Sequence, residues 1–142
     1  MNAQGPGKAT FVWPVRVYWE DTDAGGIVFY ANYLKFFERS RTEWLRERGI
    51  SQQTLKEATG GMFVVGEVQV RFLKSARLDD ELLVTTSLLN AGRASMTIHQ
   101  QALLKTADRP VLLCEATVRA GWVQASTLKP DRIPSQIIHA LT

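Results

Sequence analysis

One long stretch of apolar side chains at helical spacing most constrains what this chain folds into. From about residue 32 to residue 48, large apolar residues recur every three or four positions, which is the period of an amphipathic α-helix. They are Tyr33, Leu34, Phe37, Trp44 and Leu45, and Arg41 interrupts their stripe. Gly49 is a natural C-terminal stop for this helix. A helix this apolar needs a large partner surface.

Four segments after the helix predict that partner surface. Apolar and polar residues alternate over residues 63–74, 81–89, 94–104 and 111–124, which is typical of half-buried strands. The turns between these segments are short, and short turns join antiparallel neighbours. The sequence therefore predicts an antiparallel sheet with one face covered by the helix.

Two shorter elements are expected at the ends of the chain. Residues 13–19 alternate between apolar and polar side chains and predict a strand, although the pattern alone does not place it in the sheet. A proline-punctuated exit at 129–134 precedes a short helix through Ile137 and Ile138. The expected fold class is α+β, with the long helix lying in a curled antiparallel sheet.

Size and composition are those of one globular domain. The chain has 142 residues, of which 45% are hydrophobic and 22% charged, so disordered and fibrous classes are excluded. We expect a flexible N-terminal tail over 1–10, without the apolar core of a secretory signal, and a single domain over 11–142. No apolar run approaches the length of a transmembrane helix. The lone Cys114 agrees with a reducing cytoplasm.

The net charge of +3 is mildly basic. Nucleic-acid-binding proteins concentrate Lys and Arg in blocks, whereas here they are dispersed among acidic residues. We therefore expect no nucleic-acid partner. The basic excess would suit binding of a polyanionic small molecule. It is equally consistent with an ordinary solvated surface.

An acidic, glycine-rich turn precedes the long helix. Glu20, Asp21 and Asp23 lie within four residues and are followed by Gly25 and Gly26. A carboxylate held beside a helix N-terminus joins a base or nucleophile to a dipole that stabilises an oxyanion. Aspartates beside glycines also cap turns, so the pattern alone leaves both roles open. The glycines would let the backbone adopt conformations closed to other residues.

Three segments resemble one known family. Residues 13–18, 20–26 and 36–43 are similar to the hotdog-fold acyl-CoA thioesterases of the 4-hydroxybenzoyl-CoA thioesterase type. They are most similar to its bacterial branch associated with the Tol-Pal envelope system, often called YbgC-like. Residues 76–80, 128–130 and 133–134 also match, so the resemblance covers roughly residues 12–136. The Asp-x-Asp-x-x-Gly segment is specific for this family when it lies between a strand and a helix.

The resemblance implies a five-stranded antiparallel sheet wrapped around one long helix, in homodimers or homotetramers with active sites between subunits. By position, Asp23 would be the catalytic carboxylate, and the backbone N–H of Tyr30 would polarise the thioester carbonyl. Many members of the Tol-Pal branch have histidine where this chain has Tyr30. A role of the backbone N–H is compatible with either side chain. No cofactor or metal is required.

Substrate contacts are expected from five residues. Gly25 and Gly26 would allow the substrate to approach, and Phe29 and Tyr33 would line an acyl pocket. Arg93 falls where the hydroxybenzoyl-CoA type has a basic cluster for the phosphates of coenzyme A. An ordinary solvated surface position would explain Arg93 equally well. Lys74, Arg77 and Arg71 are weaker candidates for contact with the CoA phosphates.

Cysteine and histidine chemistry has little support in the sequence. Cys114 lies within an alternating strand, as a small core residue would. A cross-strand pair with His99 is geometrically possible, and the other histidine, His139, is near the C-terminus. Two isolated histidines and one cysteine do not make a metal site.

The expected function is hydrolysis of acyl-CoA to free acid and CoA, in the cytoplasm or peripheral to the inner membrane. The alternative is an envelope-associated binding partner of acyl carrier protein or phospholipid-synthesis enzymes, with little hydrolytic activity. A hotdog dehydratase acting on acyl carrier protein ranks last, because that chemistry uses a histidine and none lies near the acidic turn or the helix.

Overall fold

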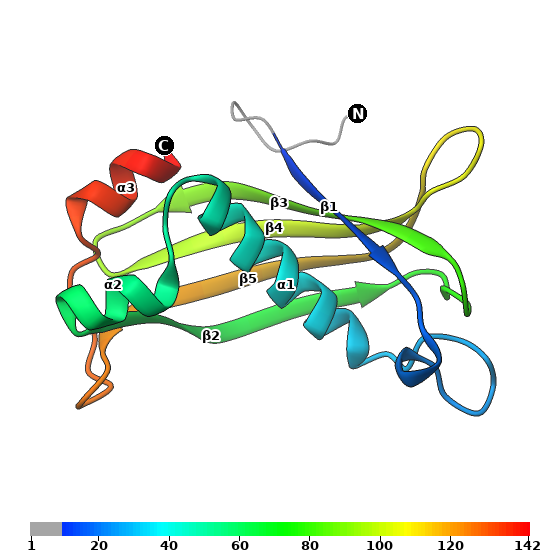
Figure 1. The fold of residues 1–142 in the computed structure, drawn as a ribbon, viewed down its shortest axis with the longest axis horizontal. Helices are drawn as coiled ribbons and strands as arrows, with labels where there is room; N and C mark the ends of the chain where they lie inside the picture. The colour runs from blue at the N-terminus through cyan, green and yellow to red at the C-terminus, as the bar shows by residue number, and fades with distance from the viewer. Residues whose placement is uncertain (1–9) are drawn as a thin grey trace.

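The computed structural model describes residues 10–142 and confirms the predicted hotdog fold (Figure 1). One antiparallel sheet has the strand order β1-β3-β4-β5-β2. Its strands are β1 (Phe11–Arg16), β2 (Gly61–Phe72), β3 (Glu81–Ala91), β4 (Ser95–Leu104) and β5 (Val111–Gln124). The helices are η1 (Trp19–Asp21), α1 (Asn32–Glu47), α2 (Gln52–Thr59) and α3 (Ser135–Leu141). The predicted tail over 1–10 lies outside the described residues, except for Thr10.

Helix α1 lies across one face of the sheet, as its apolar stripe predicts (Figure 1). Phe36, Phe37 and Trp44 are almost completely buried against sheet residues such as Val84 and Ile98. Each large side chain of this kind stabilises the fold by roughly 1.5–3 kcal/mol when it leaves water. Burial of the apolar face therefore fixes the orientation of α1, and with it the position of the acidic turn that precedes the helix.

The first strand differs from its prediction. β1 runs over Phe11–Arg16 rather than 13–19, and it pairs with β3 at one edge of the sheet. Beyond it, the Tyr18 N–H donates to the Asp21 carboxylate, which turns the chain into η1. The alternation of side chains continues past residue 16, but this local hydrogen bond ends the strand.

The other strands follow their predictions to within two residues. β2 begins and ends two residues earlier than expected, and β3 continues two residues further. At the end of β2, Leu73 and Lys74 both donate their N–H groups to the carbonyl of Leu113, which breaks the regular ladder. The predicted short helix through Ile137 and Ile138 is α3.

Helix α2 was not predicted. None of its eight residues is buried, so it has no apolar stripe for a periodicity argument to find. It ends at Gly60, whose positive φ of 77° suits glycine at a helix C-terminus. Across residues 10–142, no helix is long and apolar enough to cross a membrane.

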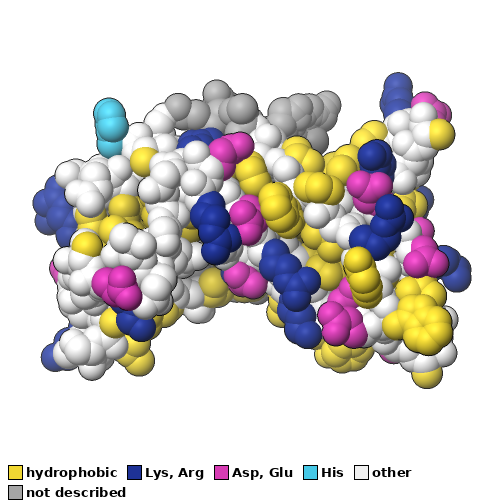
Figure 2. All heavy atoms as spheres, viewed as in Figure 1, with side chains coloured by type: hydrophobic (Ala, Val, Ile, Leu, Met, Phe, Trp, Pro, Cys, Tyr) yellow, Lys and Arg dark blue, Asp and Glu magenta, His cyan; other side chains and the backbone are white. Residues whose placement is uncertain are grey.

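Charged side chains are mixed on the face that carries α1. Figure 2 shows Lys and Arg interspersed with Asp and Glu there, without a continuous basic area. This agrees with the dispersed charge of the sequence.

Candidate active site

The acidic turn holds Asp23 in a closed loop with its carboxylate exposed. The Asp23 N–H donates to the Ile27 carbonyl at 2.9 Å, and the Asp23 carbonyl accepts the Gly26 N–H at 3.0 Å. The Gly25 N–H donates to Asp23 Oδ1 at 2.8 Å, whereas Oδ2 accepts no hydrogen bond from residues 10–142. Asp23 therefore makes the expected turn contact with one oxygen and leaves the other available.

The two glycines contribute differently to this loop. Gly26 has a φ of +80°, in the left-handed region that favours glycine. At Gly25, an added Cβ would lie 3.2 Å from Asp23 Oδ1, closer than most real Cβ contacts. Gly25 thus makes room for the Asp23 carboxylate, and Gly26 allows the chain to turn.

Asp21 ties the turn to the start of α1. Its side chain is buried and accepts the Tyr18 N–H at 2.8 Å. Its carbonyl accepts the Phe29 N–H at 3.0 Å and the side-chain amide of Asn32 at 2.8 Å. Glu20 is exposed. These contacts give Asp21 a structural role, because they join the turn directly to the first residue of the helix.

Tyr30 lies in the turn just before α1. The helix begins at Asn32 with Ala31 as its N-cap, so Tyr30 precedes the first helical residue by two positions. The Tyr30 carbonyl accepts the Tyr33 N–H at 3.3 Å, in the first tight turn of the helix. The Tyr30 N–H itself has no acceptor within the described part of the chain. It is therefore a free donor at the positive end of a 16-residue helix.

Asp23 and Tyr30 line the same cavity, of about 240 Å³. Tyr33, Phe72 and Leu73 form apolar parts of its wall. The Phe72 ring lies 5.7 Å from the Tyr30 ring and 5.9 Å from the Tyr33 ring, measured between centroids. The fold thus brings the end of β2 against the start of α1, and the acidic turn forms another part of the cavity wall.

Tyr33 forms a rigid part of this wall. Its side chain is only 3% exposed, and its hydroxyl accepts the Ala76 N–H at 3.1 Å. Burial raises the pKa of Tyr33 above its usual value, so the hydroxyl stays neutral. Tyr33 therefore contributes packing and a fixed hydroxyl, and no charge.

Phe29 and Arg93 lie apart from the cavity. Phe29 packs on the Tyr30 ring at 4.9 Å but does not line the cavity wall. Arg93 lies in the hairpin between β3 and β4, beside α3 and with Arg132 and His139. Near the acidic turn, the Val28 N–H donates to the Ala76 carbonyl. From there β3 extends away from the turn over 11 residues, roughly 35 Å of extended chain. Within one chain, Arg93 is at the far end of the sheet from Asp23.

The remaining cavity residues were predicted incompletely. Lys74 appeared only as a weak candidate for phosphate contact, and Ile27, Val28, Phe72, Leu73 and Ser75 were not predicted to line the site. The alternation of residues 63–74 signals a strand, but the strand pairing needed to bring its end to the acidic turn is long-range. No local signal in the sequence carries that information.

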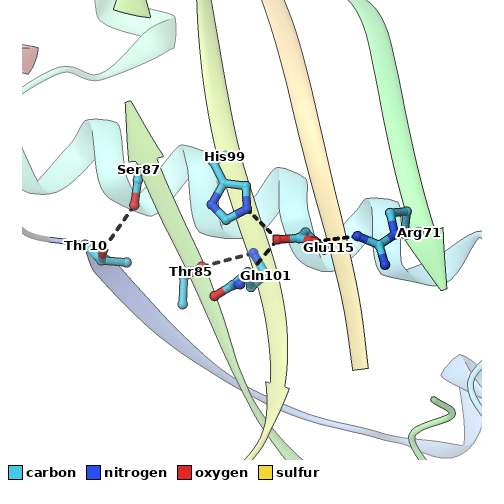
Figure 3. Close-up of polar contacts among 7 residues, drawn as sticks. All are labelled: Thr10, Arg71, Thr85, Ser87, His99, Gln101 and Glu115. Carbon is cyan, nitrogen blue, oxygen red and sulfur yellow. Dashed lines mark hydrogen bonds and ion pairs between the residues drawn. The ribbon is translucent and has the colours of Figure 1, made fainter. Parts of the chain in front are cut away.

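His99 and Cys114 do not form a pair. Cys114 is completely buried, and burial raises the pKa of its thiol to about 12. His99 lies on the sheet face away from α1, where its Nε2 is 2.9 Å from Glu115 Oε2 (Figure 3). Arg71 donates to the other oxygen of Glu115 at 3.4 Å. Among residues 10–142, no three His, Cys, Asp or Glu side chains form a cluster suited to a metal ion.

Comparisons with known proteins identify the family. Residues 17–141 match the Thioesterase-like superfamily. The chain is 41% identical over 127 residues to acyl-CoA thioesterase YbgC of Haemophilus influenzae, covering 89% of this chain and 90% of that one. It is 42% identical over 128 residues to acyl-CoA thioester hydrolase YbgC of Escherichia coli O157:H7, covering 90% and 92%.

Solved structures have the same fold. A crystal structure of a probable thioesterase from Bartonella henselae has a TM-score of 0.79 at 30% identity and covers 89% of this chain and 100% of that one. A mutant of 4-hydroxybenzoyl CoA thioesterase, complexed with 4-hydroxybenzoyl CoA, has a TM-score of 0.88 at 17% identity and covers 94% and 99%. The resemblance predicted from the sequence motifs is thereby confirmed: the chain belongs to the Thioesterase-like superfamily.

Proposed function

We propose that this protein hydrolyses acyl-CoA thioesters to the free acid and CoA, with Asp23 as its essential carboxylate. The observation that carries the proposal is the cavity that Asp23 and Tyr30 both line: Asp23 is exposed, and the Tyr30 N–H has no acceptor within residues 10–142. The similarity to relatives named acyl-CoA thioesterase and acyl-CoA thioester hydrolase supports it.

The Tyr30 N–H would polarise the thioester carbonyl. As the tetrahedral intermediate forms, negative charge develops on the carbonyl oxygen, and a free N–H at a helix N-terminus stabilises that charge. A single donor of this kind contributes roughly 10²–10³ in rate. Because the donor belongs to the backbone, the tyrosine side chain is not needed for this step.

Asp23 has two routes to the acyl carbon. In the nucleophilic route, its carboxylate displaces the CoA thiolate and forms a mixed anhydride, which water then hydrolyses. In the general-base route, the carboxylate removes a proton from water as that water attacks, and the thiolate leaves. In a single turnover with a radiolabelled acyl group, only the nucleophilic route attaches the label to the protein.

The cavity suits an apolar acyl group near the reacting carbon. Phe72 and Leu73 supply apolar wall, and Tyr33 supplies a buried ring. Lys74 is exposed and lines the same cavity, so it is our candidate for a phosphate contact with CoA. Arg93 would contact the same CoA only from a second copy of the chain.

A homodimer joined through β2 would complete the site. β2 pairs on one side with β5, and within residues 10–142 its other edge is unpaired over 12 residues. Val65 and Phe72 are 45% and 48% exposed on this strand. Free strand edges of this length pair readily with another chain.

Light scattering tests the dimer. It should give at least twice the monomer mass of 15.9 kDa, and a monomer at micromolar concentration would contradict the dimer.

A thiol-release screen tests the proposed reaction. Short, medium, long and aromatic acyl-CoAs are incubated with the purified chain, and release of CoA is followed with a thiol reagent. We expect turnover of at least one class well above spontaneous hydrolysis. No turnover of any acyl-CoA or acyl-carrier-protein thioester, together with a stable partner recovered by pulldown, would instead support a binding role in envelope lipid metabolism.

A further inference from the structure

Asn32, the first residue of α1, reaches back to the acidic turn with its side chain. The residue is only 8% exposed, and its Nδ2 donates to the Asp21 carbonyl at 2.8 Å. Only the amide nitrogen can make this bond, because a carbonyl oxygen accepts and does not donate. Asn32 does not line the cavity that Asp23 and Tyr30 share. It can therefore act on a substrate in that cavity only through the backbone that it holds.

The backbone just before α1 is held on both sides of Phe29. The Phe29 N–H donates to the Asp21 carbonyl at 3.0 Å, and this is the same oxygen that accepts the Asn32 amide. The Phe29 carbonyl accepts the backbone N–H of Asn32 at 2.8 Å. Asn32 thus holds this segment twice, once through its side chain and once through its backbone.

These hydrogen bonds set the direction of the Tyr30 N–H. The Phe29 carbonyl and the Tyr30 N–H belong to one planar trans peptide group, so the two point in opposite directions. Because the carbonyl points to the backbone of Asn32, the N–H points away from it. No backbone carbonyl of residues 10–142 accepts this N–H, and Tyr30 lines the cavity. The donor is free while its own peptide group is fixed.

A fixed donor is what an oxyanion requires. A backbone N–H that is already in place needs no reorganisation at the moment of reaction. Misplacement of a catalytic group by about 1 Å can lower the rate roughly 10²-fold. A residue that holds the peptide group of Tyr30 therefore affects the rate although it lies outside the cavity.

We propose that Asn32 is the positioning residue of the oxyanion donor. Its amide and its backbone N–H hold the Phe29–Tyr30 peptide, so the Tyr30 N–H stays free to polarise the thioester carbonyl. The catalytic part of this role rests on the proposed thioester hydrolysis. An aspartate would also suit the start of a helix, because it interacts favourably with the helix dipole, but it has no N–H to donate to the Asp21 carbonyl. Asn32→Asp therefore separates positioning from ordinary stabilisation of the helix.

Relaxation of ¹⁵N in the free chain tests the holding of the donor without any substrate. The order parameter of the Tyr30 N–H should be roughly 0.85 in the wild type, as in rigid backbone. Asn32→Asp sets a carboxylate against the Asp21 carbonyl and should lower the order parameter below roughly 0.7, towards the flexible range. Asn32→Ala should also lower it. This second variant is expected to fold, because the Asp21 carbonyl keeps the Phe29 N–H. A rigid Tyr30 N–H in both variants would overturn the proposal.

Kinetics test the effect of the fixed donor on the reaction. Both Asn32 variants should lose at least about ten-fold in kcat with the best acyl-CoA of the screen, while KM stays within about two-fold, because an oxyanion donor acts in the transition state. Ser40→Ala is the matched control. It removes another buried side-chain bond from α1, to the Val84 carbonyl at 3.0 Å, further along the helix. It should change neither kcat nor the order parameter of the Tyr30 N–H.

Failure of the positioning role and failure of the proposed hydrolysis give different results. Wild-type kcat in the folded Asn32 variants, or an equal loss of kcat in Ser40→Ala, would overturn the positioning role. No turnover by the wild type would overturn the proposed hydrolysis. The relaxation data would then still decide whether Asn32 holds the Tyr30 N–H.

Discussion

Asp23 combines a structural contact of the turn with the carboxylate that we propose for the chemistry. Its Oδ1 closes the turn by accepting the Gly25 N–H, and its Oδ2 is left without a partner among residues 10–142. The position of the carboxylate therefore depends on Gly25, which touches it directly. A change at Gly25 should act on catalysis by moving Asp23.

Gly25→Ala should lower turnover about ten-fold, because misplacing a reacting group by a fraction of an ångström has effects of this order. The new Cβ would lie 3.2 Å from Asp23 Oδ1. Gly92→Ala is the matched control, since its Cβ would meet only the Ser95 carbonyl at an ordinary 3.5 Å. Steady-state kinetics with the best acyl-CoA of the screen make the comparison. Equal rates for the two variants would show that the Gly25 contact does not position the carboxylate.

Glu115 should contribute to stability in a pH-dependent way. The hydrogen bond from His99 is the main reason that the pKa of Glu115 lies below its ordinary value of 4.5, and Gln101 and Arg71 lower it further. Because the pKa is lower in the folded chain than in the unfolded chain, ionised Glu115 stabilises the fold above about pH 4.5. That contribution disappears as the pH falls through the folded value.

Glu115→Gln should therefore lower the free energy of unfolding by about 1 kcal/mol at neutral pH, the usual size for a partly exposed charged hydrogen bond. The difference from wild type should shrink as the pH falls from about 6 to about 3. Thermal unfolding across this range measures it. Glu67→Gln, an exposed glutamate on the same strand face as Arg71, is the control. A pH-independent difference would argue against the ionised contact.

At the scale of elements, α1 is joined to the sheet by polar contacts as well as by apolar packing. Ser40 Oγ donates to the Val84 carbonyl at 3.0 Å and lies 2.7 Å from Thr86 Oγ1. Gln100 connects the same Thr86 to the Phe37 carbonyl and to Arg41. All of these except Arg41 are buried, so loss of one member leaves others without partners.

Gln100→Leu should destabilise the fold by about 2 kcal/mol, because it removes the hydrogen-bond partner of the half-buried Arg41 and the amide donor to the buried Thr86. Urea unfolding monitored by circular dichroism gives this free energy. Gln69→Leu, on the exposed part of β2, should change it by no more than about 0.5 kcal/mol. Similar effects for both variants would mean that the network adds nothing to helix docking.

Most helices and strands could be predicted from the sequence, because the spacing of apolar residues follows the buried face of each element. α1 and the four later strands have the expected alternation, since each presents one face to the core. α2 has no buried residue and was missed for that reason. The end of β1 was misplaced because the hydrogen bond from Tyr18 to Asp21 overrides the continuing alternation.

At the scale of the whole molecule, strand order decides which residues meet. The resemblance to a known family singled out Asp23 and Tyr30 by their positions in its motif, whereas the acidic turn alone left the role of its carboxylates open. It did not predict that Phe72 and Leu73 would complete their cavity, because that contact depends on β2 lying at the edge of the sheet. Arg93 was expected near the substrate, but the length of β3 carries it to the opposite end of the chain's own sheet.

The most direct measurement is kcat/KM for thioester hydrolysis by Asp23→Asn and by Glu20→Gln, with the best acyl-CoA of the screen. Glu20 lies three residues from Asp23 on the same exposed turn, so it controls for loss of a negative charge. We expect Asp23→Asn to lose at least 10³-fold, as enzymes do without their base or nucleophile, with unchanged thermal unfolding, and Glu20→Gln to retain nearly full activity. Turnover by folded Asp23→Asn at the wild-type rate would contradict the central role of Asp23.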